Sequence, residues 1–184
     1  LKKMVLEHHT AVLMSLHELD LAQKISDYVI CVHGDQIEKY GTPEEIFCGD
    51  YISELYGMTA GHYDAGTGEL ELQPVSGAPK VFVIAGGGRG KAVFRRLQRQ
   101  GMPFATGILW ENDLDYPSAK ALAVQTVAVR TFSAVDAEHI EKAKELIDSC
   151  ETVLTVFDRT EWTKLPEGLK EILAYAEEKS KLTE

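Results

Sequence analysis

The chain has 184 residues, of which 45% are hydrophobic and 26% charged, as in an ordinary globular protein that buries a sizeable core. Its net charge of −10 disfavours nucleic acid as a general partner. No apolar run approaches the roughly 20 residues of a membrane span, so we expect any membrane association to be made through a partner. The cysteines stand singly, without metal or redox spacing, which favours a reducing cytoplasm: Cys31, Cys48 and Cys150.

The charge is distributed unevenly along the chain. Residues 1–78 contain 4 Lys or Arg against 13 Asp or Glu, whereas residues 79–184 contain 15 against 16. This change coincides with the linker-like sequence Gln-Pro-Val-Ser-Gly-Ala-Pro at residues 73–79. We therefore predict two domains, over residues 1–72 and 80–184, joined by a linker over residues 73–79.

The N-terminal region begins with a short, nearly all-apolar run. Residues 11–16 have the length and composition of a buried strand, and the run ends at His17. A helix is expected over residues 19–25. Two β-rich runs, 28–32 and 36–40, flank Gly34-Asp35, which is typical of a hairpin turn.

A helix is predicted to begin directly after this hairpin. Thr42 is a candidate N-cap, Pro43 the first helical residue and Glu45 the third, which predicts a capping box. Residues 50–56 predict one more short helix, ended by Gly57. Residues 62–72 predict a small hairpin with its turn at 64–68.

The order of these features resembles the C-terminal end of an ATP-binding subunit of an ATP-binding cassette (ABC) transporter. It is most similar to the branch that serves iron-siderophore, haem and cobalamin importers, and the resemblance covers residues 1–72. It implies that His17 is the switch histidine, which contacts the ATP γ-phosphate and helps to polarise the attacking water. The alternative is a histidine at the edge of a core, satisfied by its own backbone neighbours.

The resemblance also implies properties of the parent protein. These are bound ATP and Mg²⁺, ATP hydrolysis, a second ATPase subunit, and membrane permease subunits that hold it at the inner face of the cell membrane. The 184 residues lack a phosphate loop, a Leu-Ser-Gly-Gly-Gln signature and an apolar run ending in Asp-Glu. We therefore expect a truncated, inactive ATPase domain that binds no cofactor. Its strand at 11–16 has lost its neighbours, and it could pair as a homodimer.

From residue 80 the pattern alternates between strands and helices. Strands are predicted over 81–85, 104–110, 124–129 and 152–157. Helices are predicted over 91–100 and 118–122. A third helix is predicted after a cap at Ser133 or Asp136, and a fourth begins at Pro166. This alternation predicts an α/β fold, a small four-stranded parallel, doubly wound (Rossmann-like) domain.

Polar residues follow each predicted strand, where ligands bind in such sheets. The first is a glycine-rich turn into a helix, which suits an anion, and residues 80–110 carry six basic and no acidic residues. Glu111 stands where an acid could bind a ribose hydroxyl, and Glu111 and Asp158 are candidate general acids or bases. The candidate ligand-binding residues for an anionic small molecule are Gly86, Gly87, Gly88, Arg89, Gly90, Lys91, Glu111 and Asp158.

Other interpretations of this region remain open. Lys91 replaces the third glycine of a dinucleotide motif, and the glycines could simply form a tight turn. Trp110 and Trp162 could wall a cleft, although aromatic residues at strand ends more often pack. The domain could bind the imported cargo or a nucleotide and regulate the ATPase, mediate dimer or partner contacts, or act as an enzyme on the imported compound. No metal site is expected, since His8-His9 is typical of a solvated helix end.

Overall fold

The computed structural model describes residues 2–48, 51–57, 61–64 and 69–183. The chain divides into two compact units. The N-terminal unit comprises Leu1–Thr59 and Tyr63–Leu70, and the C-terminal unit comprises Ala60–His62 and Glu71–Glu184. Among the described residues, no helix is long and apolar enough to cross a lipid bilayer.

The N-terminal unit consists of short elements. Its helices are α1 (Lys2–His8), α2 (Leu19–Ile25), α3 (Pro43–Ile46) and α4 (Tyr51–Leu55). Strands β1 (Val29–His33) and β2 (Gln36–Gly41) form an antiparallel hairpin. Strand β3 (Gly61–Asp64) pairs with β4 (Glu69–Leu72), and each of these two strands contains residues of both units. The predicted turn residues 65–68, like Asp50 at the predicted start of α4, lie outside the described residues.

Local sequence signals in this unit are confirmed. The β1–β2 hairpin turns at Gly34, whose φ of 63° suits glycine, and His33 is opposite Gln36. Thr42 and Glu45 form the predicted capping box at α3, in which Glu45 Oε2 accepts from the Thr42 amide at 2.9 Å. A small apolar cluster underlies these elements and contains Cys31, Ile46, Phe47, Ile52 and Tyr63.

The prediction of a buried strand over residues 11–16 is wrong. Residues 10–18 form neither helix nor strand, and the side chain of Leu13 is 88% exposed. A strand inside a sheet needs neighbouring strands to receive its backbone hydrogen bonds. Within the part of the chain that the structure describes, no strand pairs with this segment.

The C-terminal unit contains one parallel five-stranded sheet. Its strands are β5 (Val81–Ile84), β6 (Phe104–Trp110), β7 (Gln125–Val129), β8 (Thr152–Thr155) and β9 (Leu182–Thr183). They lie in the order β7-β6-β5-β8-β9, so the chain adds strands on one side of β5 and then on the other. The four predicted strands are present, but the sheet has five strands rather than four. The fifth, β9, was missed because a two-residue strand has no sequence pattern of its own.

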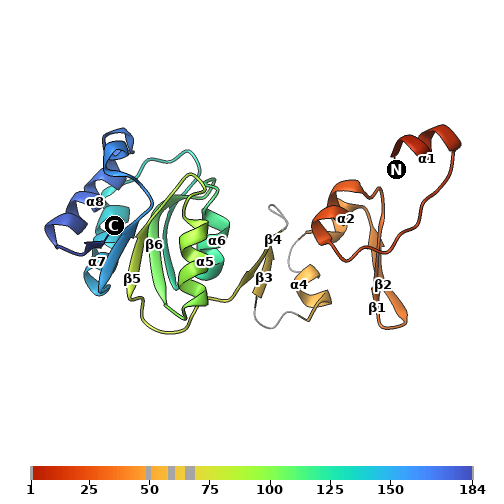
Figure 1. The fold of residues 1–184 in the computed structure, drawn as a ribbon, viewed down its shortest axis with the longest axis horizontal. Helices are drawn as coiled ribbons and strands as arrows, with labels where there is room; N and C mark the ends of the chain where they lie inside the picture. The colour runs from red at the N-terminus through yellow and green to blue at the C-terminus, as the bar shows by residue number, and fades with distance from the viewer. Residues whose placement is uncertain (1, 49–50, 58–60, 65–68, 184) are drawn as a thin grey trace. The chain divides into compact units, whose positions relative to one another are not determined.

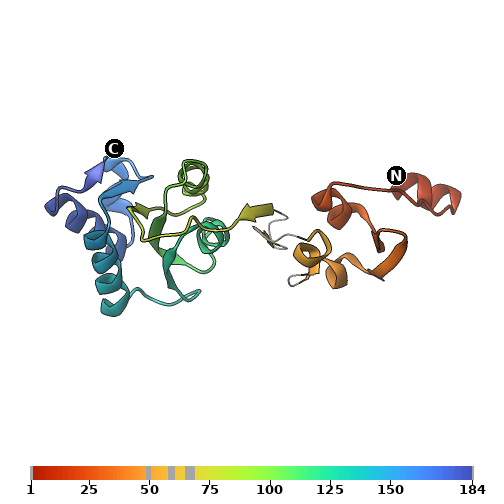
Figure 2. The same cartoon turned by 90° about the horizontal axis from the view of Figure 1, so that it is seen from below.

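Helices cover both faces of this sheet (Figure 1 and Figure 2). Helices α5 (Lys91–Arg99) and α6 (Tyr116–Leu122) pack on one face through Phe94, Leu97 and Leu122. Helices α7 (Ala137–Ser149) and α8 (Glu167–Glu178) pack on the other. Asp136 rather than Ser133 caps α7, accepting from the His139 amide at 3.0 Å, and Pro166 precedes α8 as predicted.

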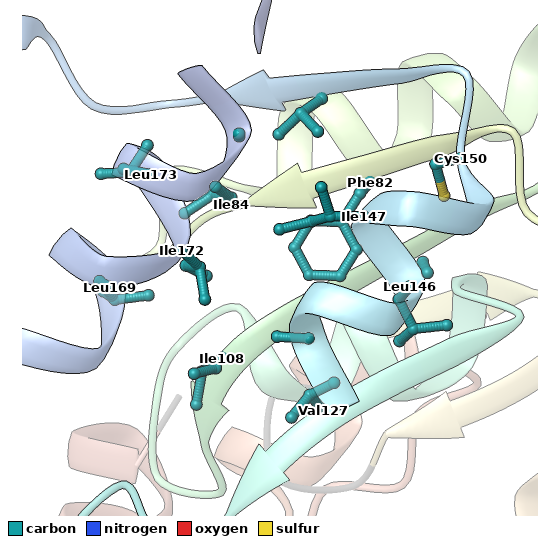
Figure 3. Packing of buried hydrophobic residues seen from close by; sticks show 14 of the residues in the cluster. Phe82, Ile84, Ile108, Val127, Leu146, Ile147, Cys150, Leu169, Ile172 and Leu173 are labelled. Carbon is teal, nitrogen blue, oxygen red and sulfur yellow. The ribbon is translucent and has the colours of Figure 1, made fainter. Parts of the chain in front are cut away.

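Successive side chains of β5 point to opposite faces of the sheet and contribute to two apolar clusters, one on each face. Phe82 and Ile84 face α7 and α8, where Figure 3 shows them beside Ile147 and Ile172. Val81 and Val83 belong to the cluster on the opposite face. All four residues of β5 are buried, as expected of a central parallel strand.

Candidate functional site

The carboxyl ends of the parallel strands meet at one edge of the C-terminal sheet. Four segments lie there: the glycine-rich loop 86–90 after β5, residues 111–115 after β6, residues 130–133 after β7, and residues 156–158 after β8. This edge is the usual place for a ligand in such a sheet. The predicted site residues of the C-terminal unit are found in these segments, except Lys91, which begins α5.

Two carboxylates of the protein accept hydrogen bonds from backbone amides of the glycine-rich loop. The Gly87 amide donates to Asp113 Oδ2 at 2.9 Å, and the amides of Gly90 and Lys91 donate to the Asp115 carboxylate at 2.9 and 3.0 Å. Asp115 is fully buried. These amides are the donors that an anionic ligand would need, so the contacts do not favour an anion at this loop.

The glycines of this loop have structural roles. Gly87 and Gly88 have φ values of 69° and 80°, a backbone conformation that favours glycine. A Cβ at Gly90 would lie 2.7 Å from the Cβ of Ala85 and 2.7 Å from the ring of Phe94. The loop therefore needs glycine to form a tight strand-to-helix turn, as in the alternative interpretation of its sequence.

Arg89 is held by its neighbours. Its guanidinium donates to Glu161 at 2.9 Å and lies 4.8 Å from the ring centroid of Phe157. The hydrogen bond from Arg89, together with that from the Asp158 amide, lowers the pKa of Glu161 below its ordinary value. This ion pair joins the loop after β5 to the short 3₁₀ helix η1 (Arg159–Lys164), which the sequence analysis missed.

Asp158 and Glu111, the two candidate acids or bases, differ in their surroundings. Asp158 is the N-cap of η1 and forms a capping box with Glu161. Glu111 is exposed, and its amide donates to the Val129 carbonyl at 2.9 Å, which extends the β6–β7 pairing. These positions give Asp158 a structural role and leave the Glu111 carboxylate in solvent.

Several basic residues of the segment 80–110 form ion pairs with carboxylates. Arg95 on α5 forms a short ion pair of 2.6 Å with Glu71, which is buried and also accepts from Ser118 Oγ at 2.8 Å. Lys80 pairs with Glu151 at 3.9 Å. Local sequence does not reveal these carboxylates, because they lie outside the basic segment at residues 80–110.

A cavity of about 350 Å³ lies at the same edge and was not predicted as a site. Its lining residues are Trp110, Asn112, Asp113 and Phe132. Trp110 was a candidate cleft wall, whereas Trp162 is not among the residues that line this cavity: its indole donates to the Phe157 carbonyl at 3.2 Å. The sequence signal for the rest was the polar run Glu-Asn-Asp that directly follows a buried strand.

His17 belongs to the N-terminal unit, in the irregular segment between α1 and α2, and its side chain is exposed. The described residues offer no phosphate cradle near it in sequence, and the glycine-rich loop of the C-terminal unit donates to carboxylates instead. The residues present therefore do not fit ATP and Mg²⁺ by themselves. Among the described residues, no group of three His, Cys, Asp or Glu side chains could hold a metal ion.

The chain is similar in sequence to ATP-binding proteins of ABC transporters. The ABC transporter ATP-binding protein MJ0873 of Methanocaldococcus jannaschii is 32% identical over 111 residues, or 59% of this chain and 38% of that protein. The cobalamin import ATP-binding protein BtuD of Halobacterium salinarum is 26% identical over 133 residues, or 68% of this chain and 33% of that protein. The petrobactin import ATP-binding protein YclP of Bacillus subtilis is 32% identical over 59 residues, or 32% of this chain and 23% of that protein.

The chain thus spans at most 38% of the length of these curated relatives. A model of the MJ0874 family matches residues 104–182, which extend from β6 to β9 in the C-terminal unit. No solved structure matches the chain.

Proposed function

We propose that this chain is part of the ATP-binding subunit of an ABC importer for iron complexes or cobalamin. The names of its relatives, which include cobalamin and petrobactin import proteins, support this proposal. In it, the whole subunit binds ATP and Mg²⁺, pairs with a second ATPase subunit and contacts permease subunits at the inner face of the membrane. The phosphate loop, signature and Asp-Glu pair belong to parts of the subunit that this sequence does not contain.

The surface of the N-terminal unit carries the proposal. In the β1–β2 hairpin, Ile30 is opposite Tyr40 and Val32 is opposite Ile37, with a register shift between Cys31 and Val32, so the two side chains of each pair share a face. They are between 49% and 71% exposed. An apolar face of this kind marks an interaction surface. We propose that in the whole subunit the rest of the ATP-binding domain covers this hairpin face.

The proposal assigns His17 the role of the switch histidine. A histidine that contacts the γ-phosphate polarises the attacking water only while the nucleotide is held in place by other groups, since phosphoryl transfer depends on positioning and charge neutralisation. Its exposed, irregular position fits a residue that acts on a nucleotide held by other parts of the proposed subunit.

For the C-terminal unit we propose a non-catalytic binding module that regulates the ATPase or contacts a partner. The Rossmann-like classification belongs to this proposal and is supported by the strand order around β5. Because Asp113 and Asp115 accept from the loop amides, this alternative fits the geometry better than an anionic ligand at residues 86–91.

The test uses the complete subunit and the 184-residue chain side by side. In the complete subunit, His17→Ala should lower ATP hydrolysis by about 10²-fold or more while nucleotide binding persists. His9→Ala, at an exposed residue directly after α1, is the matched control and should hydrolyse ATP normally. The 184-residue chain should hydrolyse no ATP. Turnover by that chain, or full activity of the His17→Ala subunit, contradicts the proposal.

A further inference from the structure

The cavity after β6 and β7 differs chemically from the predicted anion site. Two of its four lining side chains, Trp110 and Phe132, are aromatic, and the others are the Asn112 amide and the Asp113 carboxylate. It is largely open to solvent, and its volume of about 350 Å³ can accommodate a small cationic group. Aromatic faces and a carboxylate attract cations and repel anions.

Hydrogen bonds hold the Trp110 indole and the backbone of the turn that carries Phe132. The Trp110 indole donates to the Ser133 carbonyl at 2.9 Å, and the Ser133 amide donates to the Arg130 carbonyl at 2.9 Å. These bonds fix the turn after β7 at its start and its end. Phe132, within this turn, is 96% exposed and has a φ of 64°. The turn thus places an exposed apolar ring at the cavity.

The carboxylate is also oriented. Asp113 Oδ1 accepts from the Asp115 amide at 2.8 Å, and both oxygens accept from the Gly87 amide. These backbone amides orient the Asp113 carboxylate but leave its negative charge in place. Because a carboxylate has about four acceptor positions, it can accept a further hydrogen bond from a ligand. Arg89, the cation of the adjacent loop, pairs with Glu161 instead.

We propose that this cavity binds a small organic cation, an alkylammonium or guanidinium group, with its charge directed to Asp113 and its carbon atoms against Trp110 and Phe132. This site is independent of the ABC assignment, because it uses residues of the C-terminal unit alone. It gives the proposed binding module a ligand class opposite in charge to the one predicted from the glycine-rich loop.

The test titrates the full chain with choline and with 3,3-dimethyl-1-butanol, a neutral molecule of nearly the same shape. Binding is followed by the NMR signal of the Trp110 indole N–H, assigned with a Trp162→Phe variant, since the chain has 2 Trp residues. Choline should give a saturable shift, and the neutral analogue should bind at least about fivefold more weakly, because only the cation gains from the rings and the carboxylate. Inorganic phosphate should give no shift.

Three variants sharpen the assignment. Asp113→Asn keeps an oxygen for the Gly87 amide and should weaken choline binding about tenfold by removing the charge. Phe132→Leu, at an exposed position that does not support the fold, should weaken it about threefold. Arg130→Gln is the control that should bind choline no more weakly. The proposal is overturned by equal binding of the neutral analogue, by phosphate binding, by the absence of a saturable shift with choline, or by an unchanged affinity in Asp113→Asn.

Discussion

The two units of this chain bury their apolar residues to very different extents. In the C-terminal unit both faces of a parallel sheet are covered by helices, and large side chains such as Phe82, Ile108 and Ile172 are fully buried. In the N-terminal unit the cluster around Ile46 and Tyr63 is small, and apolar side chains of the β1–β2 hairpin face solvent. The comparison distinguishes turns and caps, which neighbouring residues form by themselves, from packed sheets, which need side chains that are distant in the sequence.

The difference has an energetic basis. Burying a large apolar side chain contributes about 1.5–3 kcal/mol, which offsets the entropy of ordering the chain only when many such side chains are buried together. A hairpin turn and a capping box organise their few residues without such a core. The N-terminal unit has both features, whereas among the described residues no strand pairs with its apolar run at residues 11–16.

The largest effect is expected in the core of the C-terminal unit. The Phe82 ring is fully buried and lies between the sheet and helices α7 and α8. Phe82→Ala should therefore lower the free energy of unfolding of this unit by about 3–5 kcal/mol. Urea denaturation followed by tryptophan fluorescence measures this unit alone, because both tryptophans, Trp110 and Trp162, belong to it. Phe132→Ala, at a ring that is 96% exposed, is the control and should cost little. Equal losses in the two variants would contradict the core described here.

A smaller effect is expected in the N-terminal unit, where Ile46 and Ile37 form a matched pair. Ile46 is fully buried in its apolar cluster, whereas Ile37 lies on the exposed face of the hairpin. Ile46→Ala should lower the stability of this unit by about 2 kcal/mol, and Ile37→Ala should change it by less than about 0.5 kcal/mol. Hydrogen exchange of the β1–β2 amides measures both changes without interference from the C-terminal unit.

In the complete ATP-binding subunit that we propose, part of this expectation is reversed. If the hairpin face is covered there, as we propose, Ile37→Ala should destabilise that subunit while leaving the 184-residue chain unaffected. A loss of stability in the short chain as well would show that the face is already packed within it, and would remove the main support for the proposed function.

The same comparison explains which sequence predictions succeeded. The turn at Gly34 and the capping box of Thr42 and Glu45 depend on residues at most three positions apart, so a local pattern suffices. Strands β5 to β8 of the C-terminal unit were predicted because buried parallel strands are short apolar runs. The run at residues 11–16 has the same pattern but no neighbouring strand among the described residues, and pairing cannot be derived from the run itself.

The candidate site shows the same limit at the level of side chains. The sequence placed the glycine-rich loop at the correct edge, but Asp113 and Asp115 reach its amides from more than twenty positions away. Arg89 and Glu161 are 72 positions apart. The charge of a site is decided by such distant pairs, and for this reason a basic, glycine-rich segment predicted an anion at a loop whose amides already donate to carboxylates.

The smallest expected effect concerns the pair of Glu161 and Arg89. Because the pKa of Glu161 is lowered below its ordinary value of 4.5, its contribution to stability is present above about pH 4.5 and is lost as the pH falls through the lower, folded-state value. Glu161→Gln should therefore be less stable than wild type at neutral pH, and the difference should vanish in acid. Carboxyl NMR gives the pKa directly, and Arg89→Met should raise it towards the ordinary value, whereas Arg96→Met, an exposed arginine of α5, should not. An unchanged pKa in Arg89→Met would show that the Asp158 amide holds Glu161 by itself, and that the loop after β5 is not tied to η1 by charge.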